Sequence, residues 1–196
     1  MLSRLGFATA ALDAKLLTQH GLGLSTLELA VREDQLVQPE DAARVADLLQ
    51  RRMTGESVAR LMGEREFYGL AFALNAATLE PRPDTELLVD LALGAMPAGG
   101  TLLDLGTGTG CIAISILANT VGIGAVAVDL SALALEAAAA NAARHGVAER
   151  LALLQGSWFA PLARQRFELI VSNPPYIASD VVETLADEVR DFDPRL

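Results

Sequence analysis

The sequence predicts an α/β protein in which a small helical domain precedes a parallel, doubly wound sheet. Two observations carry this prediction. Residues 1 to about 60 place apolar residues at helical spacing, whereas the sequence from about residue 101 onward alternates between β-type runs and helix-type runs. A glycine-rich turn also links the first of those β-type runs to the helix after it. Strands that alternate with helices are typical of parallel sheets, which bind ligands at the carboxyl ends of their strands.

The first 62 residues are expected to form a domain of short packed helices. The segment "QPEDAARVADLLQRR" has a proline and acids at its start and arginines at its end, which suits both ends of a helix dipole. The apolar residues expected to pack these helices together are Leu12, Leu16, Leu17, Leu27, Leu29, Val31, Val45, Leu48 and Leu49. At residues 63–78 the pattern changes to "GEREFYGLAFALNAAT", which predicts a hairpin or connector over 63–80 that leads to a second domain at 81–196.

The second domain begins with a helix-like run, "LLVDLALGAM", which a break of proline and glycine separates from the sheet. The sheet is then expected from four β-type runs and the helices between them. These are "TLLDL" before the glycine turn, "GAVAVDLS" before an alanine-rich helix, "LALLQGSW", and "FELIVSNPPYI".

Composition narrows the class of protein. With 196 residues, of which 52% are hydrophobic, the protein is large enough to bury a real core. A formal charge of -10 argues against binding nucleic acid through its phosphates. One cysteine and two histidines provide neither a disulfide framework nor a zinc cluster, so no metal is expected and a reducing cytoplasm is favoured. No apolar run is long enough for a membrane span or a signal peptide, which predicts a soluble, cytoplasmic protein.

The glycine turn is the first candidate binding element. Gly106, Gly108 and Gly110, with Thr107 and Thr109 between them, would let the backbone approach a ligand closely at the start of a helix. Their G-x-G-x-G spacing departs from the G-x-G-x-x-G dinucleotide motif, and Asp104 lies just upstream. A tight strand-to-helix turn without a ligand is the alternative interpretation.

Asp129 is the second candidate, because a carboxylate at the end of the second strand can accept both hydroxyls of a ribose. The alternative is that Asp129 only caps the following helix, although Ser131 would serve that purpose equally well. Together the turn and the acid describe a pocket for a nucleoside, which fits both NAD and S-adenosylmethionine.

The tip of the fourth strand distinguishes these two cofactors. It consists of Asn173, Pro174, Pro175 and Tyr176. The side-chain oxygen of Asn173 and the carbonyl of Pro174 could accept the two N–H bonds of a planar amino group, on a turn stiffened by prolines. Tyr176 could pack against the flat face of that group. This arrangement suits methylation of an amide or exocyclic nitrogen, whereas an edge turn capped by asparagine is the structural alternative.

Four motifs resemble the protein glutamine-N5 methyltransferases of the HemK type, which modify the glutamine of the Gly-Gly-Gln loop in peptide-chain release factors. The motifs are "GEREFYGL" at 63–70, "PRPDTE" at 81–86, "LDLGTGTG" at 103–110 and "SNPPYI" at 172–177. "NPPY" is shared with adenine-N6 DNA methyltransferases, whereas "PRPDTE" ahead of the glycine turn is strongly specific for the family.

The resemblance implies a role for each site residue. Residues 106–110 would cradle the methionine part of S-adenosyl-L-methionine, Asp129 would hold its ribose, and Trp158 would lie beside its adenine, unless Trp158 is simply part of the core. Asn173 to Tyr176 would receive the glutamine, with Asn173 also next to the cofactor. Arg82, Asp84 and Glu86 resemble a loop over the cofactor. The helical domain would help to recognise the release factor.

The resemblance also implies a Rossmann-like class I methyltransferase sheet, which normally has seven strands. About four are recognisable here, so we expect an incomplete sheet, a sequence truncated at its carboxyl end, and weak cofactor binding. The alternatives for function are glutamine methylation of a ribosomal protein, against which "PRPDTE" argues, adenine-N6 methylation of nucleic acid, and an inactive truncated fragment.

Overall fold

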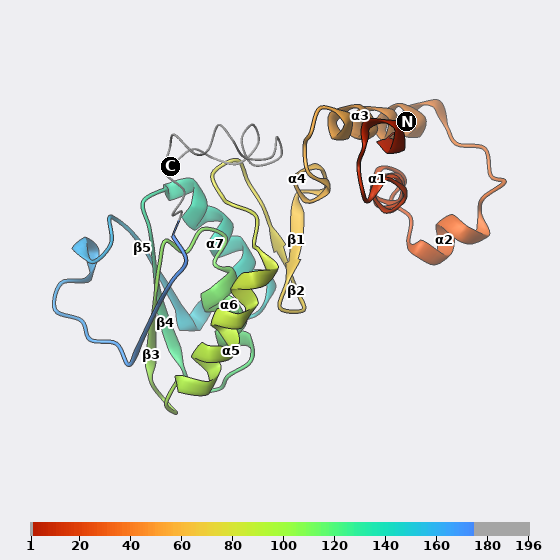
Figure 1. The fold of residues 1–196 in the computed structure, drawn as a ribbon. Coiled ribbons are helices and arrows are strands. Elements are labelled where there is room, and N and C mark those ends of the chain that lie inside the picture. The colour runs from red at the N-terminus through yellow and green to blue at the C-terminus, as the bar shows by residue number, and fades with distance from the viewer. Residues whose placement is uncertain (1, 175–196) are drawn as a thin grey trace. The chain divides into compact units, whose positions relative to one another are not determined.

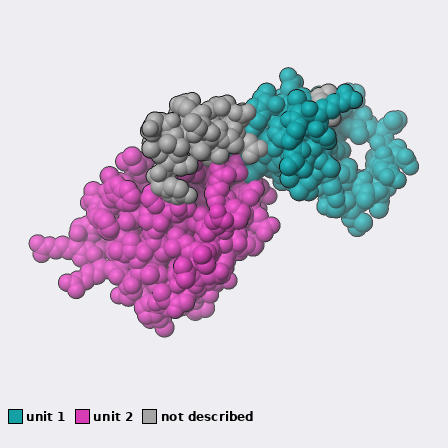
Figure 2. All heavy atoms as spheres, in the orientation of Figure 1, with its two compact units in different colours: residues 1–62, 182–192 teal, residues 63–181, 193–196 magenta. Residues whose placement is uncertain are grey.

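The structure is a computed structural model that describes residues 2–174. The described residues form two compact units, residues 2–62 and 63–174, which are coloured separately in Figure 2. Each unit has its own hydrophobic core.

The first unit consists of short helices. The 3₁₀ turn η1 (Leu2–Leu5) comes first, followed by the helices labelled in Figure 1, which are α1 (Ala10–Leu22), α2 (Thr26–Val31), α3 (Pro39–Met53) and α4 (Val58–Met62). The helix predicted from "QPEDAARVADLLQRR" is therefore present as α3, with Pro39 in its first turn. Ser25 caps α2 by accepting a hydrogen bond from the Glu28 amide, while Glu28 accepts one from the Ser25 amide.

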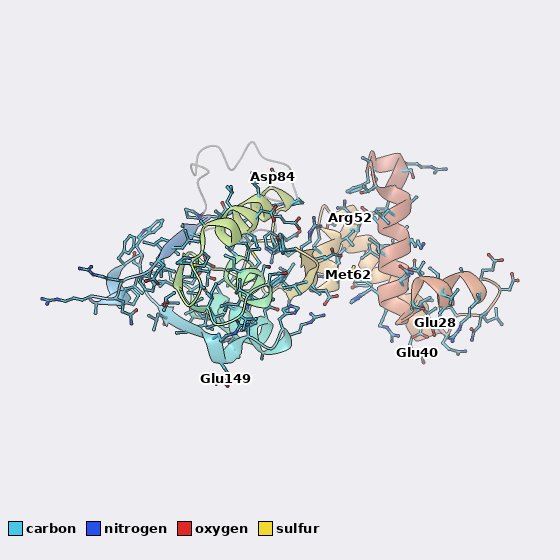
Figure 3. The ribbon with its side chains drawn as sticks, turned by 90° about the horizontal axis from the view of Figure 1, so that it is seen from below. Glu28, Glu40, Arg52, Met62, Asp84 and Glu149 are labelled. Atoms are coloured by element: carbon cyan, nitrogen blue, oxygen red, sulfur yellow. The ribbon has the colours of Figure 1, made fainter. Side chains whose placement is uncertain are left out.

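The core of the first unit lies between α1, α3 and α4, where Leu17, Leu48 and Leu61 are buried together. Helices α1 and α3 approach closely because Gly21 has no side chain, and a Cβ there would lie 2.8 Å from Val45. The Arg52 guanidinium, on the residue labelled in Figure 3, donates a 2.8 Å hydrogen bond to Asp13. Because both side chains are almost fully buried, removing either one would leave an uncompensated charge in the core.

Fewer residues of the first unit are buried than the spacing of its apolar residues predicts. Leu12, Leu27 and Val31 were expected to pack inward, but each is more than half exposed. Helix α2 has only six residues, none of which is buried. Periodicity identifies the helices correctly, yet so short a helix does not bury the side chains that the pattern selects.

The second unit opens with the expected hairpin, in which β1 (Glu64–Phe67) pairs antiparallel with β2 (Leu70–Ala73). Tyr68 and Gly69 form its two-residue turn, both with positive φ, at 52° and 72°. This is the turn geometry that matches the twist of paired strands. The hairpin packs into the unit's main core through Phe67 and Phe72.

A parallel sheet of four strands organises the rest of the described second unit. The strands are β3 (Thr101–Leu105), β4 (Gly124–Asp129), β5 (Leu151–Gln155) and β6 (Leu169–Ser172), in the order β5-β4-β3-β6. The register aligns Leu105 with Val128 on one side and Ser172 on the other, and Asp129 with Gln155. The carboxyl ends of all four strands therefore meet at one edge.

Three helices cover one face of this sheet, as Figure 1 shows: α5 (Glu86–Ala95), α6 (Cys111–Ala118) and α7 (Ala132–Arg144). Helix α6 is buried along nearly its whole length, and its core contacts include Leu102 of β3 and Val171 of β6. This arrangement confirms the predicted α/β class with a Rossmann-like parallel sheet.

The opposite face of the sheet carries a smaller core, made by Leu103, Leu105, Val128 and Leu162. Between β5 and β6 the backbone forms only the short turn η4 (Ala160–Leu162), so the described residues place a loop rather than a long helix on this face. Pro161 is compatible with the first turn of a helix, but the turn ends at Ala163, whose φ of 51° lies outside the right-handed helical region.

Among the described residues, none of the helices has the length and hydrophobicity that crossing a membrane requires.

Candidate active site

The candidate residues predicted from sequence converge on the carboxyl edge of the sheet. The glycine turn follows β3, Asp129 is the last residue of β4, Trp158 follows β5, and Asn173 follows β6. Pro175 and Tyr176 lie outside the described residues.

The glycine loop after β3 uses three positive φ angles, at Gly106, Gly108 and Gly110. The three glycines differ in what surrounds them. A Cβ on Gly110 would lie 2.7 Å from Ile114 and 3.2 Å from Ala138, so this glycine lets helices α6 and α7 pack. A Cβ on Gly108 would meet no atom of residues 2–174 within 4 Å. The open surface of the loop is therefore at Gly106 and Gly108, where a ligand could approach the backbone.

Hydrogen bonds hold this loop against the end of β4. The amides of Gly106 and Thr107 donate to the Val128 carbonyl, at 2.8 and 3.1 Å, and the Gly108 amide donates to the Asp129 carboxylate at 2.8 Å. The side chains of Thr107 and Thr109 are buried. The loop therefore offers a ligand its glycine backbone rather than its threonine hydroxyls.

Asp104 lies beneath the loop and is fully buried. The Thr107 hydroxyl donates a 2.7 Å hydrogen bond to its Oδ2, whereas its Oδ1 has no hydrogen-bond partner among the described residues. Burial, with a smaller contribution from the nearby Asp129 charge, raises the pKa of Asp104 to about 6, although the Thr107 hydroxyl and the Ala113 amide act in the opposite direction. Because Asp104 is fully buried, it acts on the loop through its bond with Thr107 and not through contact with a ligand.

Cys111, the first residue of α6, is also buried. Burial raises the pKa of its thiol to about 12, so the thiolate is absent at neutral pH. Cys111 is therefore unsuited to act as a nucleophile.

Asp129 does not cap helix α7. Ser131 does so, since its hydroxyl accepts a hydrogen bond from the Ala134 amide. The capping interpretation of Asp129 is therefore wrong. Its two carboxylate oxygens accept from the Gly108 and Ser131 amides, at 2.8 and 2.9 Å. Each oxygen has a second lone pair, so the carboxylate is fixed in place and can still accept two hydroxyls.

Trp158 is 55% exposed, so its interpretation as a core residue is wrong. It also has a φ of 51°, which is uncommon for a bulky side chain and typical of functional sites. The turn that carries it starts at Gly156, whose amide donates a 2.9 Å hydrogen bond to the Asp129 carbonyl. Trp158 thus presents an open aromatic face on the turn attached to Asp129.

The tip of β6 contacts both the glycine loop and the "PRPDTE" motif. A Cβ on Gly106 would lie 3.9 Å from the Cα of Pro174, so the loop and the tip are in contact range. The Ser172 hydroxyl donates a 2.8 Å hydrogen bond to the Leu105 carbonyl. The side-chain amide of Asn173 donates to the Thr85 hydroxyl at 2.9 Å.

The remaining residues of "PRPDTE" have different surroundings. Glu86 accepts a 2.9 Å hydrogen bond from the Tyr68 amide in the hairpin turn, so its carboxylate has a structural partner. Arg82 and Asp84 are exposed; Asp84 is labelled in Figure 3. Within the described residues, the link from this motif to a candidate active-site side chain is the hydrogen bond between Thr85 and Asn173.

Sequence reasoning missed Thr85 and Asn141. Asn141 is fully buried in α7, where its amide exchanges hydrogen bonds with the backbone of Ala73 and donates to the Thr109 carbonyl at 2.9 Å. It thereby ties the hairpin to the glycine loop. The signal was present, because Asn141 is one polar residue on the alanine face that includes Ala134 and Ala138.

The comparisons with known proteins first define the class. Residues 83–189 match the family model described as "Methyltransferase small domain", which makes the second unit a methyltransferase domain. Residues 1–63 match "PrmC N-terminal domain". The structure of an RNA methyltransferase from Salinibacter ruber in complex with S-adenosyl-L-homocysteine matches 55% of this sequence and 65% of its own, at 24% identity and a TM-score of 0.42.

The particular family follows from two curated relatives, both described as release factor glutamine methyltransferase. The relative from Agrobacterium fabrum is 43% identical over 96% of this sequence, and that from Nitratidesulfovibrio vulgaris is 42% identical over 94%. The protein belongs to the release factor glutamine methyltransferase family, which confirms the resemblance. It spans 67% and 63% of the length of these two relatives.

Proposed function

We propose that the protein transfers a methyl group from S-adenosyl-L-methionine to the side-chain amide nitrogen of the glutamine in the Gly-Gly-Gln motif of peptide-chain release factors. The observation that carries this proposal is how closely the two halves of the site approach each other. Pro174, next to Asn173, lies close enough to the glycine loop that a Cβ on Gly106 would be 3.9 Å from its Cα. A substrate nitrogen held at Asn173 would therefore lie next to a cofactor held by the loop.

The residues at the carboxyl edge fit S-adenosyl-L-methionine, the methyl donor of this family. The open backbone of residues 106–110 would accommodate its methionine part, the fixed Asp129 carboxylate would accept the ribose hydroxyls, and the exposed Trp158 face would cover the adenine. When bound, the cofactor supplies an electrophilic methyl on a positively charged sulfur.

Asn173 and Pro174 would orient the substrate. An amide nitrogen is a weak nucleophile because its lone pair is delocalised, so holding it in line with the methyl group is the main catalytic requirement. The Asn173 side-chain oxygen and the Pro174 carbonyl would accept the two N–H bonds of the glutamine amide, and Pro175 and Tyr176 would complete the tip. Methylation would cost the nitrogen one of those protons, which would pass to solvent, and the cofactor would leave as the neutral thioether S-adenosyl-L-homocysteine.

The helical unit would contribute to recognition of the release factor, with the domains divided at 1–62, 63–80 and 81–196 as expected from sequence. A release factor acts during translation, so the site of action would be the cytoplasm. The acidic net charge agrees with a protein partner rather than nucleic acid.

The test is transfer of labelled methyl from S-adenosyl-L-methionine to a purified release factor, followed by mapping of the modified residue. We expect one methyl group, on the Gly-Gly-Gln glutamine. The matched control is the same factor with that glutamine replaced by alanine. A ribosomal protein and a DNA duplex serve as competing substrates, and preferential labelling of either one would overturn the proposal.

A further inference from the structure

The hydrogen bond between Thr85 and Asn173 joins two motifs that lie 88 residues apart in the sequence. Thr85 belongs to η2 (Pro83–Thr85), directly before α5, and is only 8% exposed. The Asn173 side chain reaches it from the tip of β6 and donates its Nδ2–H to the Thr85 hydroxyl at 2.9 Å. The bond is thus made from an exposed tip to a buried, fixed oxygen.

The direction of this bond determines what Asn173 offers to a ligand. A side-chain amide has one acceptor oxygen and one donor nitrogen, and rotation by half a turn exchanges them. With Nδ2 engaged at Thr85, the oxygen Oδ1 points the other way. Asn173 can then accept an N–H from the substrate, whereas the reversed orientation would present a second donor and repel it.

The backbone around Asn173 is fixed separately. On one side the Ser172 hydroxyl is bonded to the Leu105 carbonyl, and on the other the proline ring restricts the backbone of Pro174 close to the glycine loop. What remains free is rotation of the Asn173 side chain about its own torsions. A single hydrogen bond at its nitrogen is sufficient to restrict that rotation.

Thr85 is in turn held by the hairpin. Glu86, its neighbour, accepts a hydrogen bond from the Tyr68 amide at 2.9 Å, and the Tyr68 hydroxyl donates to Asp90 of α5 at 2.6 Å. These two bonds fix the start of α5 from the hairpin side. The hydroxyl that Asn173 contacts therefore belongs to an anchored element.

We propose that Thr85 is a positioning residue, which orients the Asn173 amide so that its oxygen accepts an N–H from the substrate. This inference rests on the proposed function, because the substrate amide is the group that Oδ1 would meet. It assigns to "PRPDTE" a role in aligning the substrate-binding tip, in addition to any contact with the cofactor.

The first test observes Asn173 directly and needs no activity. In the ¹⁵N-labelled protein, the side-chain amide signals of Asn173 are identified by their loss in Asn173→Ala. We expect Thr85→Val to move these signals toward the position of a free amide and to speed their exchange with water, whereas Thr85→Ser preserves them. Thr120→Val is the matched control, because it removes a hydroxyl bonded to Ile116 at the far end of α6. Unchanged Asn173 signals in Thr85→Val would overturn the inference.

The second test separates alignment from folding. We expect Thr85→Val to lower kcat about tenfold, the effect of one hydrogen bond, while the KM for the cofactor changes less than about twofold. Thr85→Ser should restore kcat. Equal losses in the valine and serine variants would show that the hydroxyl is not the cause and would overturn the inference. If Asn173→Ala kept full activity, the proposed function of Asn173 would fail, while the amide signals would still decide whether Thr85 orients it.

Discussion

The two edges of the same four-stranded sheet differ in how their polar groups are satisfied. At the amino edge, the Arg150 guanidinium donates to the carbonyls of Leu117 and Thr120 at the end of α6, at 2.7 and 3.0 Å. The Thr101 amide donates to the Glu168 carboxylate at 2.7 Å. At this edge the charged side chains satisfy backbone carbonyl and amide groups of the fold.

At the carboxyl edge, by contrast, some polar groups still have unused hydrogen-bonding capacity. Asp104 has a buried oxygen without a partner among the described residues, Asp129 has lone pairs to spare, and Gly108 borders open space. Trp158 holds an unusual backbone angle there while its ring is exposed. The comparison shows that strain and incomplete hydrogen bonding, rather than charge alone, distinguish the edge that holds the candidate site from the opposite edge.

The largest expected effect is that of Asn173→Ala at the carboxyl edge. Removing the side-chain acceptor should lower kcat for methyl transfer by about 10²- to 10³-fold, as for other single groups that stabilise or align a transition state. Because the side chain is exposed and the fold loses only its hydrogen bond to Thr85, the free energy of unfolding should fall by no more than about 1 kcal/mol. Steady-state kinetics and thermal melting check this. A large loss of stability with unchanged kcat would place Asn173 with the structural residues.

The next effect is the pH dependence of stability that Asp104 confers. Its pKa is about 6 in the folded protein, against 3.8 in the unfolded protein, so between these values the folded state binds more protons and stability falls as pH rises. Below about pH 4 the carboxyl group is protonated in both states and adds nothing to the pH dependence of stability. Above about pH 6 it is ionised in both states, and the loss of stability stays constant. Between about pH 4 and pH 6 the stability of Asp104→Asn should therefore rise relative to that of the wild type by on the order of 2 to 3 kcal/mol.

Chemical denaturation from pH 4 to 8 measures this difference. The difference between the two stability curves should be constant below about pH 4, change in favour of the variant toward pH 6, and then stay constant. Curves that stay parallel over the whole range would contradict the assignment of a raised pKa to the buried Asp104.

Two glycine variants in the same loop should affect different properties, one the affinity for the cofactor and the other the stability of the fold. Gly108→Ala adds a Cβ in open space at a φ of 55°, so it should weaken cofactor binding about tenfold or more and destabilise the fold only by about 1 kcal/mol. Gly110→Ala forces a Cβ against Ile114 and should lower stability by about 1 to 3 kcal/mol. Calorimetric titration and thermal melting on both variants check this. The reverse pattern would mean that the open surface of the loop is not where the ligand lies.

The smallest effect is expected at the amino edge. Arg150→Ala removes the hydrogen bonds to the last carbonyls of α6 and should lower the free energy of unfolding by about 1 to 2 kcal/mol. Its kcat and KM at a temperature well below the melting point should equal those of the wild type. Arg150→Lys keeps the charge but not the fork of donors, and should fall between the two in stability. A changed KM would show that a substitution at the amino edge affects the candidate site at the carboxyl edge.

Much of the fold follows from local pattern. The four β-type runs, the glycine turn and the alanine-rich helix each lie within one continuous stretch, so their periods are visible in the sequence. Asp129 and Asn173 could be placed at one edge because parallel strands bring their carboxyl ends together. The ends of strands are predicted less accurately from the sequence. Strand β5 ends at Gln155, although the predicted strand continued through "GSW".

Other features could not be read from sequence for physical reasons. Trp158 could have been core or surface, because a large aromatic residue suits either until its backbone angle is known. The bond from Asn173 to Thr85 spans 88 residues, and no local pattern encodes which hydroxyl a side-chain amide will meet. Leu27 has the right spacing for a core helix, but α2 is too short to bury it.

The most direct test of the central claim is a titration of the ¹⁵N-labelled protein with S-adenosyl-L-homocysteine, followed by amide chemical shifts. The shifts should concentrate at Gly106, Gly108, Asp129, Trp158 and Asn173, while Thr101 and the open hollow lined by residues 122–125 and 149–152 at the amino edge stay unchanged. Shifts confined to that hollow, or none at saturating ligand, would contradict the assignment of the carboxyl edge as the cofactor and substrate site.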